Sequence, residues 1–269
     1  MVSKVAVVKT TKNLQASLHH AFKLIGGIDD LNTPERQVVI KPGIFDHRKN
    51  THPTVGLVGA IASCFNRAPK TLLAESDNYR GLASERLDIY KEIFNQQVLP
   101  FNLSEDSNTR GILIGNEKIG LSHILFKPSV FVSTHLLRKY SKGTILKNLL
   151  GLIPDRKKVR FHKNLVTVLL DAYKVIGGID LAVLDATHIR SGRHTVDANI
   201  IVVGRDAVAV EAVGATLVGM KPKKMPIIKE AMNRGYGEGR IDEIDVCGIP
   251  IEGLAEEIHQ QVVQLRSSS

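Results

Sequence analysis

Short runs of β-branched and apolar residues alternate along the chain with longer segments whose apolar residues recur at helical spacing. The short runs predict strands at residues 5–8, 37–40, 71–74, 129–133, 181–184, 200–203 and 243–246. Apolar residues spaced as on one helix face predict helices over residues 165–176 and 251–265. Strands that alternate with helices in this way indicate βαβ units. We therefore predict an α/β fold with a largely parallel central sheet and helices on both of its faces.

Two local features modify this alternation. Residues 111–114 and 118–121 flank Gly115-Asn116-Glu117 and predict a small hairpin excursion. The segment 21–29 is similar to the segment 172–180. The Gly-Gly pair in each predicts a helix C-cap with glycine in the left-handed conformation, followed by a strand. This similarity is explained either by a duplicated half-domain or by two helices that independently end with the same kind of cap. We predict one α/β domain over residues 1–269, with two lobes divided near residues 105–125 as the alternative, and a disordered tail at residues 267–269.

The composition is that of an ordinary globular protein, with 43% hydrophobic and 23% charged residues. Only 5% of residues are aromatic and there is no Trp, which argues against an aromatic-lined pocket. Cys64 and Cys247 stand alone, so cysteine builds neither a zinc framework nor an iron–sulfur cluster within this chain. We expect two free thiols rather than a disulfide, in a reducing compartment. Charges near the N-terminus argue against a signal peptide, and the longest uncharged stretch, residues 50–66, contains Pro53 and two glycines. We expect a cytoplasmic protein without a membrane partner.

Positive charge is concentrated in one segment. The chain has 36 Lys and Arg against 27 Asp and Glu, a formal charge of +9. Residues 138–163 contain nine of these bases and a single acid, Asp155. Such a concentration attracts anions, although a solvated charged face is the commoner meaning of a charge run. We call residues 134–163 the basic loop.

Polar or ionisable residues follow five of the predicted strands. They are Lys41, then Glu75 and Asp77, then Thr134 and His135, then Asp185, and finally Arg205 and Asp206. Ligands of open parallel sheets bind beyond the carboxyl ends of the strands, so we expect these residues to converge. Each also has a structural interpretation: Asp206 as a helix N-cap, Lys41 before a strand-ending Pro42, and the acids as solvated loop residues.

The basic loop supplies donors of several chemical kinds, which predicts an anion site. As catalytic candidates we name His135, His162 and Asp185, the last as a general base or metal ligand. Glu75 and Asp77 are candidates for holding a divalent metal ion together with Asp185. The ligand-binding candidates are Lys41, Thr134, Lys139, Lys147, Asn148, Arg156, Arg160 and Asp206.

The segment from Lys147 to Pro154 (KNLLGLIP), with Thr134-His135 before it and His162 after it, resembles the central motif of the family catalogued as domain of unknown function 362. The resemblance extends upstream to residues 38–42 and 51–53. Downstream it continues through Asp185, residues 205–213 and Gly219 to residues 235–237 and 243–248. The chain departs from the family at Ser133, Gly43 and Glu211, where members often have Lys, Asn and Asp. It also lacks the cysteine-rich ferredoxin segment of many members. The resemblance therefore implies a fold and a site, but no redox cofactor within this chain.

Two functions follow from these observations. In the first, an enzyme or binding protein holds a small phosphate- or carboxylate-bearing metabolite beside the basic loop. In the second, a nucleic-acid-binding module uses the same loop on phosphates, as a pI near 9.5 allows, although Tyr140 and Phe161 offer few rings for base stacking. Docking of an acidic protein is a third alternative. The sequence favours the small anion, leaves open whether the protein is an enzyme, and allows a homodimer.

Overall fold

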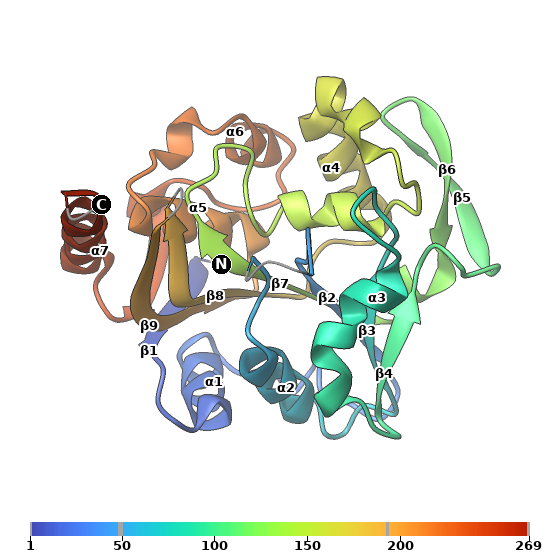
Figure 1. Cartoon of the computed structure of the whole chain (residues 1–269), viewed down its shortest axis with the longest axis horizontal. Coiled ribbons are helices and arrows are strands. Elements are labelled where there is room, and N and C mark those ends of the chain that lie inside the picture. The colour runs from blue at the N-terminus through green and yellow to red at the C-terminus, as the bar shows by residue number, and fades with distance from the viewer. Residues whose placement is uncertain (1, 48–50, 192–193, 268–269) are drawn as a thin grey trace.

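The computed structural model describes residues 2–47, 51–191 and 194–267. In these residues a central sheet lies between two layers of helices, with α1, α2 and α3 on one side and α4, α5 and α6 on the other (Figure 1). The predicted α/β class, with a mostly parallel sheet covered on both faces, is confirmed.

The sheet has eight strands in the order β10-β1-β9-β8-β7-β2-β3-β4. Their bounds are β1 (Ser3–Lys9), β2 (Val38–Pro42), β3 (Thr71–Glu75), β4 (Val98–Asn102), β7 (Val130–Arg138), β8 (Leu181–Ser191), β9 (His194–Gly204) and β10 (Ile244–Gly248). All seven predicted strands are present, and β4 was missed. Neighbouring strands are parallel except where β9 pairs with β1 and β8, to both of which it is antiparallel.

The helices fill the connections between the strands. They are α1 (Leu14–Leu24), α2 (Val55–Cys64), α3 (Ala83–Leu87), α4 (Leu165–Val175), α5 (Ala207–Leu217), α6 (Pro226–Asn233) and α7 (Ile251–Ser267). Short 3-10 helices add η1 (Asp88–Ile93), η2 (His123–Leu125), η3 (Lys147–Leu152), η4 (Lys158–Asn164), η5 (Pro222–Lys224) and η6 (Ile241–Glu243). Ser267 ends α7, and residues 268–269, the rest of the tail that we predicted to be disordered, lie outside the described residues.

The strands bury both of their faces, which explains their nearly continuous apolar sequences. In β1, Val5 and Val7 belong to the core beneath α4, α5 and α6, while Ala6 and Val8 belong to the core beneath α1 and α2. This alternation is the two-residue period of a strand. The layer on each side is therefore fixed to the sheet by its own hydrophobic core.

The predicted hairpin is present as β5 (Thr109–Ile114) and β6 (Glu117–Ser122), which form a separate two-stranded sheet. It projects beside α4 at one end of the molecule (Figure 1). The backbone N–H of Gly115 in its turn donates to Asp171 Oδ2 of α4 at 2.9 Å, and Ile114 belongs to the same core as α4. The alternative division into two lobes near residues 105–125 stays a prediction.

The repeated Gly-Gly pairs end helices as predicted. Gly26 and Gly27 have φ of 95° and 90°, and Gly177 and Gly178 have φ of 82° and 87°. The second glycine of each pair donates its N–H back into the helix, to Phe22 O and Tyr173 O, as in a Schellman cap. Both cysteines are free thiols, as expected. No helix in the described ranges has the length and apolar character needed to span a membrane.

Candidate functional site

A cavity of about 640 Å³ opens where β2, β3 and β7 end, beneath the basic loop. Seven formally positive side chains line it: Lys41, Arg86, Arg138, Lys147, Arg156, Lys157 and Lys158. Among the described residues that line the cavity, Glu75 is the one carboxylate. The wall therefore carries a large excess of positive charge, and the concave shape of the cavity focuses the resulting electric field.

The predicted convergence is confirmed for much of the candidate set. His135 and His162 line the same cavity although they come from β7 and η4. Five further candidates line it with them: Lys41, Glu75, Lys147, Asn148 and Arg156. The parallel strands β2, β3 and β7 end at one edge of the sheet, and the basic loop folds over that edge.

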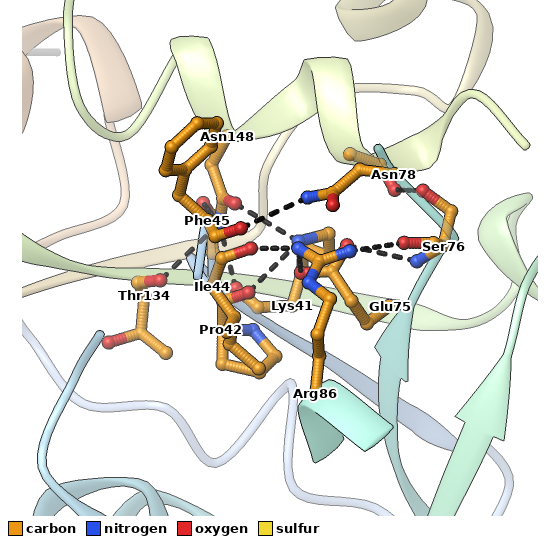
Figure 2. A network of polar contacts seen from close by, with 12 residues as sticks. Lys41, Pro42, Ile44, Phe45, Glu75, Ser76, Asn78, Arg86, Thr134 and Asn148 are labelled. Atoms are coloured by element: carbon orange, nitrogen blue, oxygen red, sulfur yellow. Dashed lines mark hydrogen bonds and ion pairs between the residues drawn. The ribbon is translucent and has the colours of Figure 1, made fainter. Parts of the chain in front are cut away.

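A buried ion cluster forms the floor of the cavity (Figure 2). Glu75 Oε2 lies 2.9 Å from Lys41 Nζ and 2.9 Å from Arg86 Nη2, and all three side chains are at most 3% exposed. Arg86 also donates to the backbone oxygens of Ile44 and Ser76. Burial alone would raise the pKa of Glu75. The positive charges of Lys41 and Arg86 outweigh this effect and lower the pKa of Glu75 below its ordinary value. Burial likewise lowers the pKa of Lys41, and Glu75 opposes that shift.

Asn148 joins the basic loop to this floor. Its Oδ1 accepts from Lys41 Nζ at 3.1 Å, and its Nδ2 donates to Lys41 O at 2.8 Å and to Thr134 O at 3.3 Å. One amide thus ties η3 to β2 and β7. Gly151, at the other end of η3, allows the close approach, because a Cβ there would lie 2.7 Å from Lys41 Nζ.

His135 is held as a neutral imidazole facing the cavity. Its Nδ1 lies 2.8 Å from Leu136 O, which only accepts, so Nδ1 carries the proton and Nε2 keeps its lone pair. Burial lowers the pKa of His135 well below its ordinary value, and the nearby Arg138 lowers it further. Gly43 makes room for the ring, because a Cβ at this position would lie 2.0 Å from His135 Cδ2. Burial and the charges of Lys142 and Lys147 also lower the pKa of His162.

Two cations in the cavity wall lack a carboxylate partner. Neither Arg138 nor Lys147 forms an ion pair within the part of the chain that the structure describes. Both lie against the ring of Tyr140, at 4.8 Å and 5.6 Å from its centroid. Arg138 Nε is buried without a hydrogen-bond partner. Burial lowers the pKa of Lys147 to about 8, and the neighbouring Arg138 contributes to this shift.

Asp206 does not join the cavity, and the expectation that it converges with the other candidates is wrong. Because β9 is antiparallel, it ends at the opposite edge, where Gly204 pairs with Val5 near the start of β1. There Asp206 caps α5 and accepts from the N–H groups of Val208 and Ala209 at 2.9 and 3.0 Å. The N-cap interpretation of this residue is confirmed.

Four other candidates lie outside the cavity lining. Asp185 is fully buried and accepts from Thr54 N at 2.7 Å and from Thr187 Oγ1 at 2.6 Å. Thr134 is fully buried within β7, and Lys139 is exposed on the surface. Arg160 forms surface ion pairs with Glu117 and Asp155.

The carboxylates that we named for a metal ion have other partners. Glu75 belongs to the ion cluster, and Asp77 Oδ1 accepts from Ala83 N at 2.8 Å. Within the described ranges, no group of three or more His, Cys, Asp or Glu side chains is placed to hold a metal ion. The predicted grouping of Glu75 and Asp77 with Asp185 is therefore not formed by these residues.

The sequence interpretation missed several residues that line the cavity. Arg86 and Lys158 were not named as candidates, and Arg138 was counted as charge without a role. The low aromatic content also misled, because Phe45, Tyr79 and Tyr140 all line the cavity. Phe45 and Tyr79 meet edge to face with ring centroids 5.7 Å apart and remain 43% and 62% exposed.

Comparison with known proteins gives one finding. No curated protein matches the chain. The model of a family described as domain of unknown function (DUF362) matches residues 129–216, which span β7, the basic loop, α4, the β8–β9 hairpin and nearly all of α5. Within this range lie His135, Lys147 and His162, which we chose from the central motif. The predicted resemblance to this family is confirmed over residues 129–216, where the chain matches the DUF362 model.

Proposed function

We propose that the cavity binds a small anionic metabolite that carries a phosphate or carboxylate group. The observation that carries this proposal is the pair of unpaired cations, Arg138 and Lys147, in a wall with an excess of positive charge. Arg138 and Lys147 are partly buried, and a partly desolvated charge without a counter-ion has a free-energy cost that an anion in the cavity would reduce. Lys and Arg are also the side chains that bind phosphate and carboxylate oxygens most strongly.

The lining also suits an organic part of the ligand. Phe45, Tyr79, Leu150 and Val159 contribute apolar surface to the same cavity as the cations. Ligand pockets of this volume combine such surface with a few polar groups that fix orientation. An anion with a short carbon skeleton therefore fits the lining better than a free inorganic ion does.

If the protein transfers protons to or from the ligand, His135 and His162 are the residues that would do so. His135 offers a neutral Nε2 as proton acceptor, and His162 lines the same cavity. We assign no proton transfer to Asp185, because four hydrogen bonds from Thr54 and Thr187 satisfy its carboxylate away from the cavity.

A nucleic-acid function has weaker support. Much of the charge of the basic loop lines the concave cavity, where a polymer backbone would have poor access to Lys147 and Lys158. A nucleic-acid module would present these cations on an open surface and would bind with a steep dependence on salt. The homodimer and the cytoplasmic location stay predictions from the sequence.

Thermal unfolding against a panel of phosphates, nucleotides, carboxylates and divalent metal ions tests the proposal. A ligand at about 100 times its Kd adds about 2.7 kcal/mol to the free energy of unfolding, which raises the midpoint by roughly 5 °C. Lys147→Met should abolish the shift. Lys139→Met, a change of the same kind at an exposed lysine of the same loop, should leave it intact. No shift from any small anion, together with tight salt-sensitive binding of RNA or DNA, would refute the metabolite and favour the nucleic acid.

A further inference from the structure

Lys158, at the start of η4, has an unusual environment for a lysine. Its side chain lines the cavity, yet the residue is only 8% exposed. The amine donates to Ser76 Oγ at 2.6 Å and to the backbone oxygen of Asp77. No carboxylate forms an ion pair with it in the ranges that the structure describes.

The directions of these hydrogen bonds are compatible with a neutral amine. Ser76 Oγ donates its own hydrogen to Gly151 O at 2.6 Å, so towards Lys158 it must accept. The oxygen of Asp77 is a carbonyl and only accepts. Two donated hydrogens therefore satisfy both neighbours. A neutral amine has two hydrogens, which leaves its lone pair free of both acceptors on a side chain that lines the cavity.

The charges around Lys158 act in both directions, and its burial favours the neutral state. The groups that act on it are Glu75, Arg86, Lys41 and Asp77. Glu75 is already paired with Lys41 and Arg86, so it is not a dedicated counter-ion for Lys158. Burial, the largest cause, lowers the pKa of Lys158 to about 7, with Arg86 and Lys41 adding to the shift and Glu75 and Asp77 opposing it. A lysine that is neutral near pH 7 is a competent nucleophile towards carbonyl carbon.

We propose that Lys158 is a nucleophilic amine that forms an imine with an anionic carbonyl compound, such as a 2-oxo acid, held in the cavity. This inference rests on the proposed function, because the cations of the cavity would hold the anionic group of that compound. The lone pair of Nζ attacks the carbonyl carbon, and the carbonyl oxygen takes up a proton to give a carbinolamine. The nitrogen gives up one hydrogen as the proton that balances the one taken up by the oxygen. Loss of water then breaks the C–O bond, removes the second N–H hydrogen and forms the C=N bond, so both amine hydrogens leave in the water. When the imine is protonated, its N–H can still bond to Ser76 or Asp77.

Reductive trapping tests the assignment. The full-length protein is incubated with limiting glyoxylate, the smallest 2-oxo acid, and sodium cyanoborohydride, which reduces an imine to a stable amine. Peptide mass spectrometry then measures the carboxymethyl adduct at each lysine. We expect Lys158 to be modified at least about tenfold more than the adjacent, exposed Lys157, because at neutral pH an ordinary lysine is almost wholly protonated. Modification of Lys158 should increase steeply between pH 6 and 8.

The variants separate this inference from the function on which it rests. Lys158→Gln removes the nucleophile and, like the neutral amine, carries no charge and keeps hydrogen-bond donors, so the adduct should vanish. In the parent protein, oxalate, which has no ketone or aldehyde, should raise the unfolding midpoint without forming an adduct. Oxalate binding without a glyoxylate adduct at Lys158 would overturn the inference and leave the proposed function standing. Preferential labelling of Lys147 or of exposed lysines would overturn it too. Failure of both oxalate binding and trapping would overturn the inference and count against the proposed function.

Discussion

Replacement of Glu75 by glutamine removes the one negative charge from the floor of the cavity and keeps the shape of the side chain. Two buried cations, Lys41 and Arg86, then lose their counter-ion, each from a contact of 2.9 Å. Breaking a buried ion pair by removing one partner costs about 3–5 kcal/mol, because the remaining charge stays desolvated. The structure points to the lower end of that range.

Four contacts reduce the penalty. Lys41 Nζ keeps Pro42 O at 2.9 Å and Asn148 Oδ1 at 3.1 Å, and Arg86 keeps the backbone oxygens of Ile44 and Ser76. The amide oxygen of the new glutamine also accepts one hydrogen bond. We therefore expect Glu75→Gln to lower the free energy of unfolding by about 3 kcal/mol, a large part of the roughly 5–15 kcal/mol that a domain has in total.

Urea unfolding at pH 7 measures this loss, with Asp245→Asn as the matched control. Asp245 Oδ2 lies 3.9 Å from Lys4 Nζ, and both side chains are about half exposed. An exposed pair of this kind contributes about 0–1 kcal/mol, so the control should differ little from the parent. If Glu75→Gln costs as little as Asp245→Asn, the cluster is hydrated and our account of the cavity floor is wrong.

The pH dependence gives a second check with a defined sign. The pKa of Glu75 in the folded protein is below its ordinary value of 4.5. The unfolded chain therefore binds the proton more readily, and the stability that Glu75 contributes is complete above pH 4.5 and is lost as the pH falls through the folded pKa. The difference between parent and Glu75→Gln should be constant from pH 6 to 8 and should shrink in acid.

Three further predictions concern the residues around this site. Gly43→Ala would place a Cβ 2.0 Å from the His135 ring, so it should lower the free energy of unfolding by about 1–3 kcal/mol and weaken anion binding. Gly253→Ala in α7, where the added Cβ meets open space, should not destabilise the protein. If urea unfolding gives the same loss of stability for both variants, the packing argument is wrong. Asp206→Ala should cost about 1–2 kcal/mol through the lost cap of α5 and leave the ligand-induced shift of the unfolding midpoint unchanged; a lost shift would mean that the opposite edge of the sheet takes part in binding. The pKa of Lys158 in the folded protein, about 7, is below its ordinary value of 10.5, so between these two values the unfolded chain binds more protons. The free energy of unfolding should therefore rise with pH by up to about 1.4 kcal/mol per pH unit. Lys158→Met should reduce this rise between pH 7 and 9, and an unchanged dependence on pH would mean that Lys158 titrates normally.

The sequence predicted the layers of the fold because buried strands and amphipathic helices leave clear apolar patterns. It missed β4 because Pro100 in the middle of that run argues against a strand, yet β4 is an edge strand, where a missing N–H is tolerated. It also could not give the direction of β9. An apolar run is the same for either direction of a buried strand, and direction decides at which edge Asp206 lies.

The candidate site was predictable to the extent that it depends on strand ends and on the density of charge. Lys41, His135 and Lys147 were named for those reasons, and all three line the cavity. Lys157 and Lys158 show where such reasoning ends, since they are identical neighbours in sequence. Lys157 is exposed, whereas Lys158 is 8% exposed and its amine donates to two acceptors. This difference comes from the packing of η4 against Ser76 and Asp77, which the sequence does not reveal.

The arrangement of charge supports our proposal that the cavity binds an anion. Glu75 is fully used by Lys41 and Arg86, so it cannot neutralise Arg138 or Lys147 higher in the wall. Exchange of that carboxylate among the cations would break hydrogen bonds that tie β2 to β3 and η3. The negative charge that Arg138 and Lys147 lack must therefore come from outside the cavity lining. On this proposal, phosphate should stabilise the protein more than chloride does at equal ionic strength. Loss of this difference in Lys147→Met would assign it to site occupancy, because the general stabilising effect of phosphate salts does not depend on Lys147.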